Sequence, residues 1–472
     1  MTAGRPVAHN LRGAPPCTSS PPPANDPPER MRQRLLNVLF WSILSAAFIG
    51  PGTVTTAASA GAEFGYDLVW ALSFSILACV VLQEASARLA LATGRTLGHS
   101  LRRHVGDRPL GLVITGTVVG AIILGCAAYE AGNILGAVEG VRLIFGGAPA
   151  AYTLLSGLGA GLLLWFSTTR VVGQVLGGVV AVMGGCFLTA AVLLDPPVGT
   201  VLQGSVLPQF PDGSSLLILA LIGTTVVPYN LFLGGGVPEG QSIREMRLSL
   251  PVAVVLGGIV SLSVLVVGAA MTDAFTFRKL ADHLARQLGG WAAYLLGGGL
   301  YAAGFSSAIT ASMAAAITAK GLAADPDAPA WQDDGHYYRL VWGGVLVVGV
   351  GFGVAQVQPV PAIILAQALN GIILPVVAIY LLLMVNSAAA LGPDQINSPG
   401  HNVLMGLVVF VTIVLGVTNV LEVLNRLVAA PVAGSTILWV SVGVALLLAW
   451  PLGQAVMRLR DRSADPTLFD AE

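Results

Sequence analysis

Charged residues are scarce in this 472-residue sequence, because 23 Lys/Arg and 24 Asp/Glu together make up only 10% of the chain. A soluble globular protein carries roughly 25% charged residues, so an ordinary soluble domain is excluded. The formal net charge of -1 provides no basic surface for a nucleic acid partner. Hydrophobic residues make up 55% of the chain, and they predict a membrane protein.

Residues that usually perform chemistry are few and scattered. The four cysteines occur singly and form no metal-binding spacing: Cys17, Cys79, Cys126 and Cys186. The six histidines all fall in predicted tails or loops: His9, His99, His104, His283, His336 and His401. The sequence also contains no phosphate loop, nucleophile triad or metalloprotease motif. We therefore expect no disulfide, no zinc site, no cofactor and no enzymatic activity.

Long apolar segments recur along nearly the whole chain. Twelve of them are long enough to cross the hydrocarbon core of a membrane, which takes a helix of about 20 residues. They are residues 35-62, 66-92, 109-138, 148-167, 170-194, 214-237, 249-271, 290-321, 338-356, 360-385, 402-422 and 434-457. Their helical rather than alternating apolar pattern argues against an outer-membrane barrel. The fold class predicted is an all-α polytopic membrane protein, in which the glycine runs 297-299 and 343-344 form close-packing helix faces.

The polar ends and loops predict how the chain lies in the membrane. Residues 1-34 are rich in Pro, Ser and Arg and are expected to be a disordered cytoplasmic tail. Residues 458-472 are expected to form a second cytoplasmic tail. Most loop Lys and Arg residues fall on one side of the span count, which places both termini in the cytoplasm. The exception, residues 272-288, has the mixed charge of an amphipathic surface helix. We expect an integral protein of a bacterial cytoplasmic membrane.

Two spans contain a helix-breaking sequence at mid-depth. Pro51 lies between Gly50 and Gly52 in the first span, and Pro228 follows Val227 in the sixth. Each break opens a run of five spans. This pattern predicts two five-helix repeats of opposite orientation, in residues 35-194 and 214-385. Two additional helices follow in residues 402-457. This organisation is typical of secondary transporters with a site at the bilayer midplane.

Each proline also frees a backbone carbonyl. Proline has no N–H, so Pro51 should release the carbonyl of Ala47 and Pro228 that of Thr224. Such carbonyls and the C-terminal ends of half-helices suit a cation, whereas the N-terminal ends suit an anion. The sequence alone leaves both ligand classes open.

Several motifs resemble one known family. They are Gly50-Pro51-Gly52-Thr53 with Ala60-Gly61-Ala62 and Gly65-Tyr66, Val227-Pro228-Tyr229-Asn230, Gln83 to Gly94, Gly304 to Thr310, and Gln367-Ala368-Leu369-Asn370-Gly371. In order and spacing they resemble the Nramp divalent-metal transporters over nearly all of residues 35 to 386. The resemblance implies the LeuT-like fold, with discontinuous helices 1 and 6.

The metal-binding side chains of that family are replaced in this sequence. Gly50 and Thr53 stand where the family has Asp and Asn in helix 1, and Val227 and Tyr229 where it has Met and His in helix 6. The pattern resembles the Nramp-related branch associated with Mg²⁺ and Mn²⁺, whose ion is thought to stay largely hydrated. On this interpretation the backbone or side-chain oxygens of Gly50, Thr53, Thr224 and Tyr229 would face the metal.

Glu130 is the most conspicuous polar residue of the apolar segments. A carboxylate deep in a span is costly, so a functional role is the default hypothesis. Asn133 lies three residues after Glu130 and four residues after Tyr129. At this spacing the three residues are expected to share one polar stripe. Glu130 would then supply the charge that Gly50 lacks; the alternative is a structural partner to a buried polar group or a neutral acid.

Other polar residues have weaker claims. In the resembling family the position of Gln367 lies near the ion, and Asn370 is one turn away; their alternative is an interhelical hydrogen bond. Tyr229 either donates to the site or packs against helix 1. Glu84 and Arg88, four residues apart, are expected to form an ion pair within their helix.

Three functions remain open from the sequence. The first is transport of partly hydrated Mg²⁺ or Mn²⁺ by alternating access, without proton coupling. Its expected partners are the transported ion and the lipid bilayer, and a monomer is plausible. The second is transport of a small organic solute or anion on the same scaffold. The third is a receptor-like protein that does not transport, which the two costly helix breaks disfavour.

Overall fold

The computed structural model describes residues 49–94, 97–100, 109–166, 169–232, 242–323, 325–326, 328–427 and 432–461. Every element in these ranges is a helix, and eleven segments there are long and apolar enough to span a membrane. These segments confirm the predicted all-α membrane architecture. Half of the first predicted span, residues 35-48 of 35-62, and the N-terminal tail lie outside the described residues.

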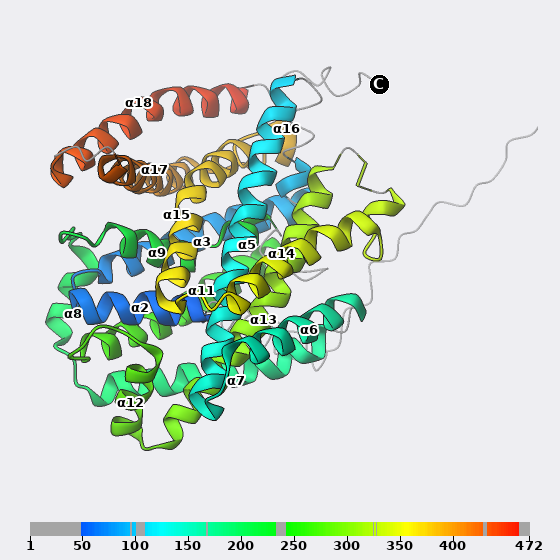
Figure 1. Cartoon of the computed structure of the whole chain (residues 1–472). Helices are drawn as coiled ribbons and strands as arrows, with labels where there is room; N and C mark the ends of the chain where they lie inside the picture. Colours follow the sequence, from blue (N-terminus) through cyan, green and yellow to red (C-terminus); the bar gives the residue numbers. More distant parts are fainter. Residues whose placement is uncertain are drawn as a thin grey trace, which may run out of the picture. The chain divides into compact units, whose positions relative to one another are not determined.

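The helices follow in the order of two five-helix runs (Figure 1). The first run is α2 (Pro51–Phe64), α3 (Val69–Thr93), α5 (Pro109–Phe145), α6 (Pro149–Phe166) and α7 (Thr169–Leu193). The second is α9 (Ser215–Thr225) with α10 (Pro228–Phe232), then α11 (Ile243–Ala269), α13 (Trp291–Leu322), α14 (His336–Val354) and α15 (Pro359–Met384). The two additional helices are α17 (Pro399–Leu427) and α18 (Gly434–Asp461).

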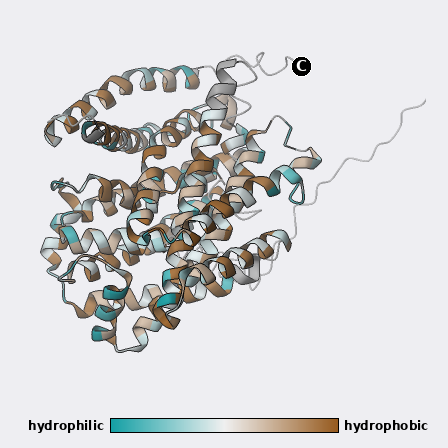
Figure 2. Cartoon of the chain, viewed as in Figure 1, coloured by the Kyte–Doolittle hydropathy of each residue, from teal (hydrophilic) through white to brown (hydrophobic). Residues whose placement is uncertain are grey.

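Short helices occupy the connections. The predicted amphipathic helix is confirmed as α12 (Phe277–Leu288), whose N-terminus is capped by the Thr276 side chain accepting from Lys279 N–H. In Figure 2 its hydrophilic residues stand out from the apolar spans. The sequence did not predict α8 (Val198–Val206), η2 (Pro329–Trp331) or α16 (Ala388–Leu391). The predicted third span, residues 109-138, is shorter than α5, which continues to Phe145 and has an ion pair between Glu139 and Arg142 in this added part.

Small residues bring the helix backbones into contact. A Cβ on Gly61 of α2 would lie 2.1 Å from the Leu265 carbonyl oxygen of α11, and one on Gly140 of α5 would lie 2.4 Å from the Gly297 carbonyl oxygen of α13. Any larger residue would push these pairs apart. The prediction of a close-packing face is confirmed at Gly297 and wrong for the run 343–344, where such Cβ atoms would meet nothing within 4 Å.

Candidate substrate site

The second predicted helix break is present, and at the first the described chain starts with Ile49 and Gly50 outside any helix. Gly50 has extended backbone (φ -95°, ψ 176°), and α2 begins directly after it with Pro51 in its first turn. In the sixth span α9 ends at Thr225 and α10 begins at Pro228, so two residues separate the half-helices. One detail differs from the expectation: the Gly50 carbonyl accepts from the Val54 N–H at 3.1 Å and thus starts the hydrogen-bond pattern of α2. Ala47 lies outside the described residues.

The two broken helices meet through threonine hydroxyls. Thr53 Oγ1 of α2 and Thr224 Oγ1 of α9 are 3.1 Å apart, and both side chains are buried. Gln367 of α15 lies against the same point, since a Cβ on Gly52 would be 2.4 Å from its Nε2 and 3.1 Å from Thr224 Oγ1. The absence of a side chain at Gly52 therefore allows three polar residues from three helices to converge beside the break.

Aromatic residues form a second wall. Tyr129 of α5 and Tyr229 of α10 pack edge to face, with ring centroids 5.5 Å apart and planes at 76°. A Cβ on Gly50 would have the Tyr129 hydroxyl at 3.8 Å and Ser307 Oγ of α13 at 3.9 Å. Tyr229 thus packs on α5 beside the break. Ser307, which lies inside one of the family-like motifs, was missed as a site residue.

Asn370 and Val227 complete this part of the core. A Cβ on Gly125, one turn before Tyr129, would lie 3.0 Å from the Asn370 Oδ1 atom, so Asn370 faces α5. Val227 is 3% exposed between the half-helices and contributes no polar atom. Among the predicted site residues within the described ranges, Gly50, Thr53, Thr224, Tyr229 and Gln367 therefore lie around the breaks, and Asn370 lies near them.

The predicted stripe of Tyr129, Glu130 and Asn133 was wrong in one respect. A Cβ on Gly349 of α14 would lie 2.7 Å from Glu130 Cγ, so the Glu130 side chain runs along α14 whereas Tyr129 faces α10. Adjacent residues of a helix point about 100° apart, and this rotation separates the two. Glu130 and Asn133 are nevertheless almost completely buried.

Buried polar atoms without hydrogen-bond partners gather in these same helices. Within the described part of the chain they include both Glu130 carboxylate oxygens, Asn133 Nδ2, Gln367 Oε1, Asn370 Nδ2, Thr55 Oγ1 and Ser59 Oγ. Leaving a buried polar group unpaired costs about 1–3 kcal/mol. The hydroxyls of Thr55 and Ser59, four residues apart on α2, were missed by the sequence analysis although their spacing places them on one helix face.

The donor set is made of neutral oxygens. Within the described ranges no group of three or more His, Cys, Asp or Glu residues is placed to hold a metal ion. Hydroxyls, amides and the carbonyls near the breaks are hard ligands, and such ligands suit Mg²⁺, Ca²⁺ or Mn²⁺ rather than soft metals. They also suit a polar organic molecule.

Two five-helix runs, the second of which opens with a broken helix, are the arrangement of the LeuT-like class of membrane protein. Comparison with solved structures agrees. The chain matches a variant of the Eremococcus coleocola manganese transporter with a TM-score of 0.66 and 18% identity, over 93% of this chain and 97% of that one. It matches Mhp1, a nucleobase-cation-symport-1 family transporter, with a TM-score of 0.52 and 16% identity, over 90% of this chain and 96% of that one.

Sequence comparison identifies the family. The profile of the natural resistance-associated macrophage protein-like (Nramp) family matches residues 42–422. A protein named divalent metal cation transporter MntH from Yersinia pestis (strain Pestoides F) is 26% identical over 296 residues, which cover 59% of this chain and 71% of that protein. The protein of the same name from Erwinia tasmaniensis is 28% identical over 297 residues, 59% of this chain and 70% of its own length. The chain belongs to the Nramp family.

Proposed function

We infer that this Nramp protein moves Mg²⁺ or Mn²⁺ across a membrane by alternating access. The family and the names of its relatives support a divalent cation as the substrate. The observation that carries the proposal is the meeting of the two broken helices at Thr53 and Thr224, 3.1 Å apart, with Gln367 beside them. Oxygen ligands at a helix break are the arrangement by which such folds hold a cation.

The missing family ligands support a partly hydrated ion. Gly50 and Val227 provide neither a carboxylate nor a thioether, so the site lacks a fixed charge to offset complete dehydration and a soft atom to select a transition metal. Mg²⁺ loses its water reluctantly and is usually held by few oxygen ligands with waters retained. The unpaired amides of Gln367 and Asn370 are suited to hydrogen bonding with such waters.

Proton coupling is not part of the proposal. The histidines of the described ranges lie outside the breaks: His99, His283, His336 and His401. Glu130 is the one fully buried carboxylate among the described residues, and its side chain runs along α14. An ion moving down its own gradient requires no proton carrier, and we therefore favour uncoupled transport.

A calorimetric titration of the purified protein tests this substrate class. Mg²⁺ and Mn²⁺ should both bind weakly and within about tenfold of each other, because neutral hard oxygens discriminate little between them. Ca²⁺, chloride and phosphate complete the panel. Replacing both hydroxyls, as in Thr53→Val with Thr224→Val, should abolish the heat of metal binding. Binding of an anion in place of the cations would contradict the proposal.

One observation favours a second candidate. The Tyr129–Tyr229 pair beside Gly50 offers an aromatic wall, and no carboxylate is present at the break itself. A small polar organic solute would stack on such rings and bond to the Thr and Gln side chains. If neither Mg²⁺ nor Mn²⁺ gives a heat of binding while the protein is folded and monodisperse, this candidate replaces the first.

A further inference from the structure

A second polar cavity lies away from the helix breaks, on the face predicted to be cytoplasmic. Its volume is about 580 Å³, and its lining combines the end of α3, the start of α11 and the segment leading into α17. The polar part of that lining consists of Arg88, Arg244, Arg247, Asp394, Gln395, Asn397, Ser398 and His401. Transport through the breaks does not use these residues.

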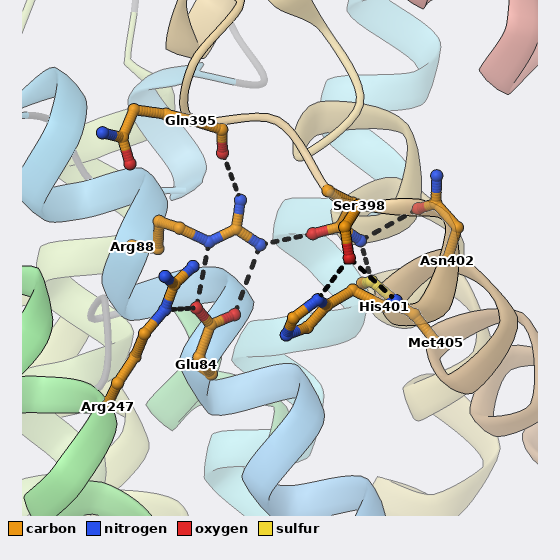
Figure 3. Close-up of polar contacts among 9 residues, drawn as sticks. Glu84, Arg88, Arg247, Gln395, Ser398, His401, Asn402 and Met405 are labelled. Carbon is orange, nitrogen blue, oxygen red and sulfur yellow. Dashed lines mark hydrogen bonds and ion pairs between the residues drawn. The ribbon is translucent and has the colours of Figure 1, made fainter.

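Arg88 anchors the floor of the cavity. It is 1% exposed and forms the predicted pair with Glu84, with Nε–Oε1 3.0 Å and Nη2–Oε2 3.2 Å. It also donates to the Gln395 carbonyl and to Asn397 Oδ1 (Figure 3). Four of its five N–H donors are therefore directed to the protein, and its role is to fix the 395–397 segment against α3.

Arg247 and Arg244 retain donors that the protein does not use. Arg247 Nε donates to Glu84 Oε1 at 2.8 Å, and no other partner for its guanidinium is found among the described residues. Arg244 is exposed at the cavity and forms no hydrogen bond or ion pair with the residues that the structure describes. The three arginines of the cavity, Arg88, Arg244 and Arg247, carry three positive charges. The carboxylates of Asp394 in the lining and of Glu84 beneath it carry two negative charges, so the group has a net charge of +1.

Two helix N-termini add to this field. Helix α11 begins at Ile243 with a capping box between Ser242 and Glu245. Helix α17 begins at Pro399, and the Ser398 hydroxyl lies 2.7 Å from His401 Nδ1 in its first turn. Ile243 and His401, in the first turns of these helices, line the cavity, so both helix dipoles favour an anion there, and the Glu245 carboxylate of the capping box offsets part of the contribution of α11.

The wall of the cavity is apolar where it approaches the membrane. Ile243 and Leu248 of α11 line it, and Leu248 is 68% exposed. Leu248 lies five residues after Ile243, about 7.5 Å farther along the helix axis and toward the apolar span. A free phosphate would have no use for this apolar wall, whereas a lipid would place its headgroup on the arginines and its chain along Leu248.

We propose that this cavity binds the phosphate headgroup of an acidic phospholipid. The guanidiniums of Arg244 and Arg247 are the headgroup ligands, since a planar guanidinium matches two phosphate oxygens at once. Arg88 is a positioning residue that holds the 395–397 wall in place. Binding at this point would bridge α11 to the segment between α15 and α17.

Native mass spectrometry of the full-length protein in detergent tests the proposal. Phosphatidylglycerol, phosphatidylcholine with the same acyl chains, and inorganic phosphate are the probes. Wild-type protein should retain phosphatidylglycerol at least tenfold more than phosphatidylcholine, and Arg244→Gln and Arg247→Gln should each remove that preference. Arg458→Gln, an exposed arginine in the last turn of α18 and outside the cavity, is the matched control and should keep it.

Three results would overturn the assignment. The first is equal retention of the two lipids by wild-type protein, and the second is an Arg244→Gln variant that behaves like Arg458→Gln. The third is displacement of phosphatidylglycerol by millimolar inorganic phosphate, which would make the cavity a site for a soluble anion. Arg244 is exposed and has no partner among the described residues, so its substitution should leave the fold intact. The readout involves no transport, and it therefore stands or falls separately from the metal proposal.

Discussion

At the scale of single residues, the chemistry of the site is defined by what replaces the family's ligands. Gly50, Thr53 and Val227 are readable from the sequence, and the structure adds how they are surrounded. Gly50 has room beside it, because a Cβ there would meet its nearest neighbours only at 3.8–4.0 Å. Its extended backbone is also open to any residue. A Cβ at position 50 is therefore accommodated without moving the helices, as the family's aspartate requires.

The first prediction uses that room. The triple variant Gly50→Asp, Thr53→Asn, Val227→Met should bind Mn²⁺ and Cd²⁺ more tightly than wild-type protein, at least tenfold relative to Mg²⁺, because it gains a negative charge and a soft sulfur. Titration calorimetry with the three metals measures the change. The double variant without Val227→Met is the control and should gain affinity without favouring Cd²⁺. An unchanged metal preference in the triple variant would mean that these side chains do not face the ion.

The second prediction concerns Glu130. If its charge stabilises the passing cation, Glu130→Gln should reduce metal flux into liposomes at least tenfold, equal to about 1.4 kcal/mol in effective barrier. Glu139→Gln on the same helix is the matched control, since Glu139 pairs with Arg142 at the end of α5 and should not affect flux. Equal fluxes for the two variants would return Glu130 to a packing role against Gly349.

At the scale of elements, sequence reasoning located the helix breaks but not the contacts that hold them. Pro51 and Pro228 identify where the helices stop, because proline acts locally. The partners of those prolines come from other helices: a Cβ on Gly136 of α5 would lie 2.1 Å from Pro51 Cβ. Rotation of each helix is likewise set by its neighbours, which is why the separate directions of Tyr129 and Glu130 escaped prediction.

The third prediction tests the support of the first break. Gly136→Ala should destabilise the protein by about 1–3 kcal/mol, since the proline ring cannot move out of the way as a flexible side chain would. Gly120→Ala on the same helix is the control, because its Cβ would meet nothing within 4 Å. Thermal unfolding in detergent compares the two variants. A Gly136→Ala protein as stable as Gly120→Ala would show that Pro51 does not depend on this contact.

At the scale of the whole molecule, the order of the helices was largely predictable from hydropathy. The spans 170-194 and 360-385, for example, agree with α7 and α15 to within one residue at each end. The short helices α8 and α16 escaped because they lack a long apolar segment. The Arg88 network also escaped beyond its pair with Glu84, since Asn397 is 309 residues away from Arg88 in the sequence.

The fourth prediction concerns orientation. Cysteines introduced at Gln203 and Gln358 should react with an impermeant reagent added outside cells, and those at Gly106 and Gln332 only after access from inside. The background should lack the four natural cysteines. Gln203, Gln332 and Gln358 are exposed in the structure, so failure to react cannot come from burial. Reaction of the Gln203 and Gln332 variants from the same face would remove the predicted topology.

The most direct test of the proposed function is metal uptake into proteoliposomes, measured for wild-type protein and for variants that lack the Thr53–Thr224 contact. Wild-type protein should carry both Mg²⁺ and Mn²⁺ down their gradients, and Thr53→Val with Thr224→Val should reduce both fluxes at least tenfold because the hydroxyl oxygens at the breaks are gone. Thr189→Val on α7, an exposed threonine that bonds only within its own helix, is the matched control. Wild-type protein that carries neither metal, or a double variant that carries them as fast as the control, would contradict the central claim.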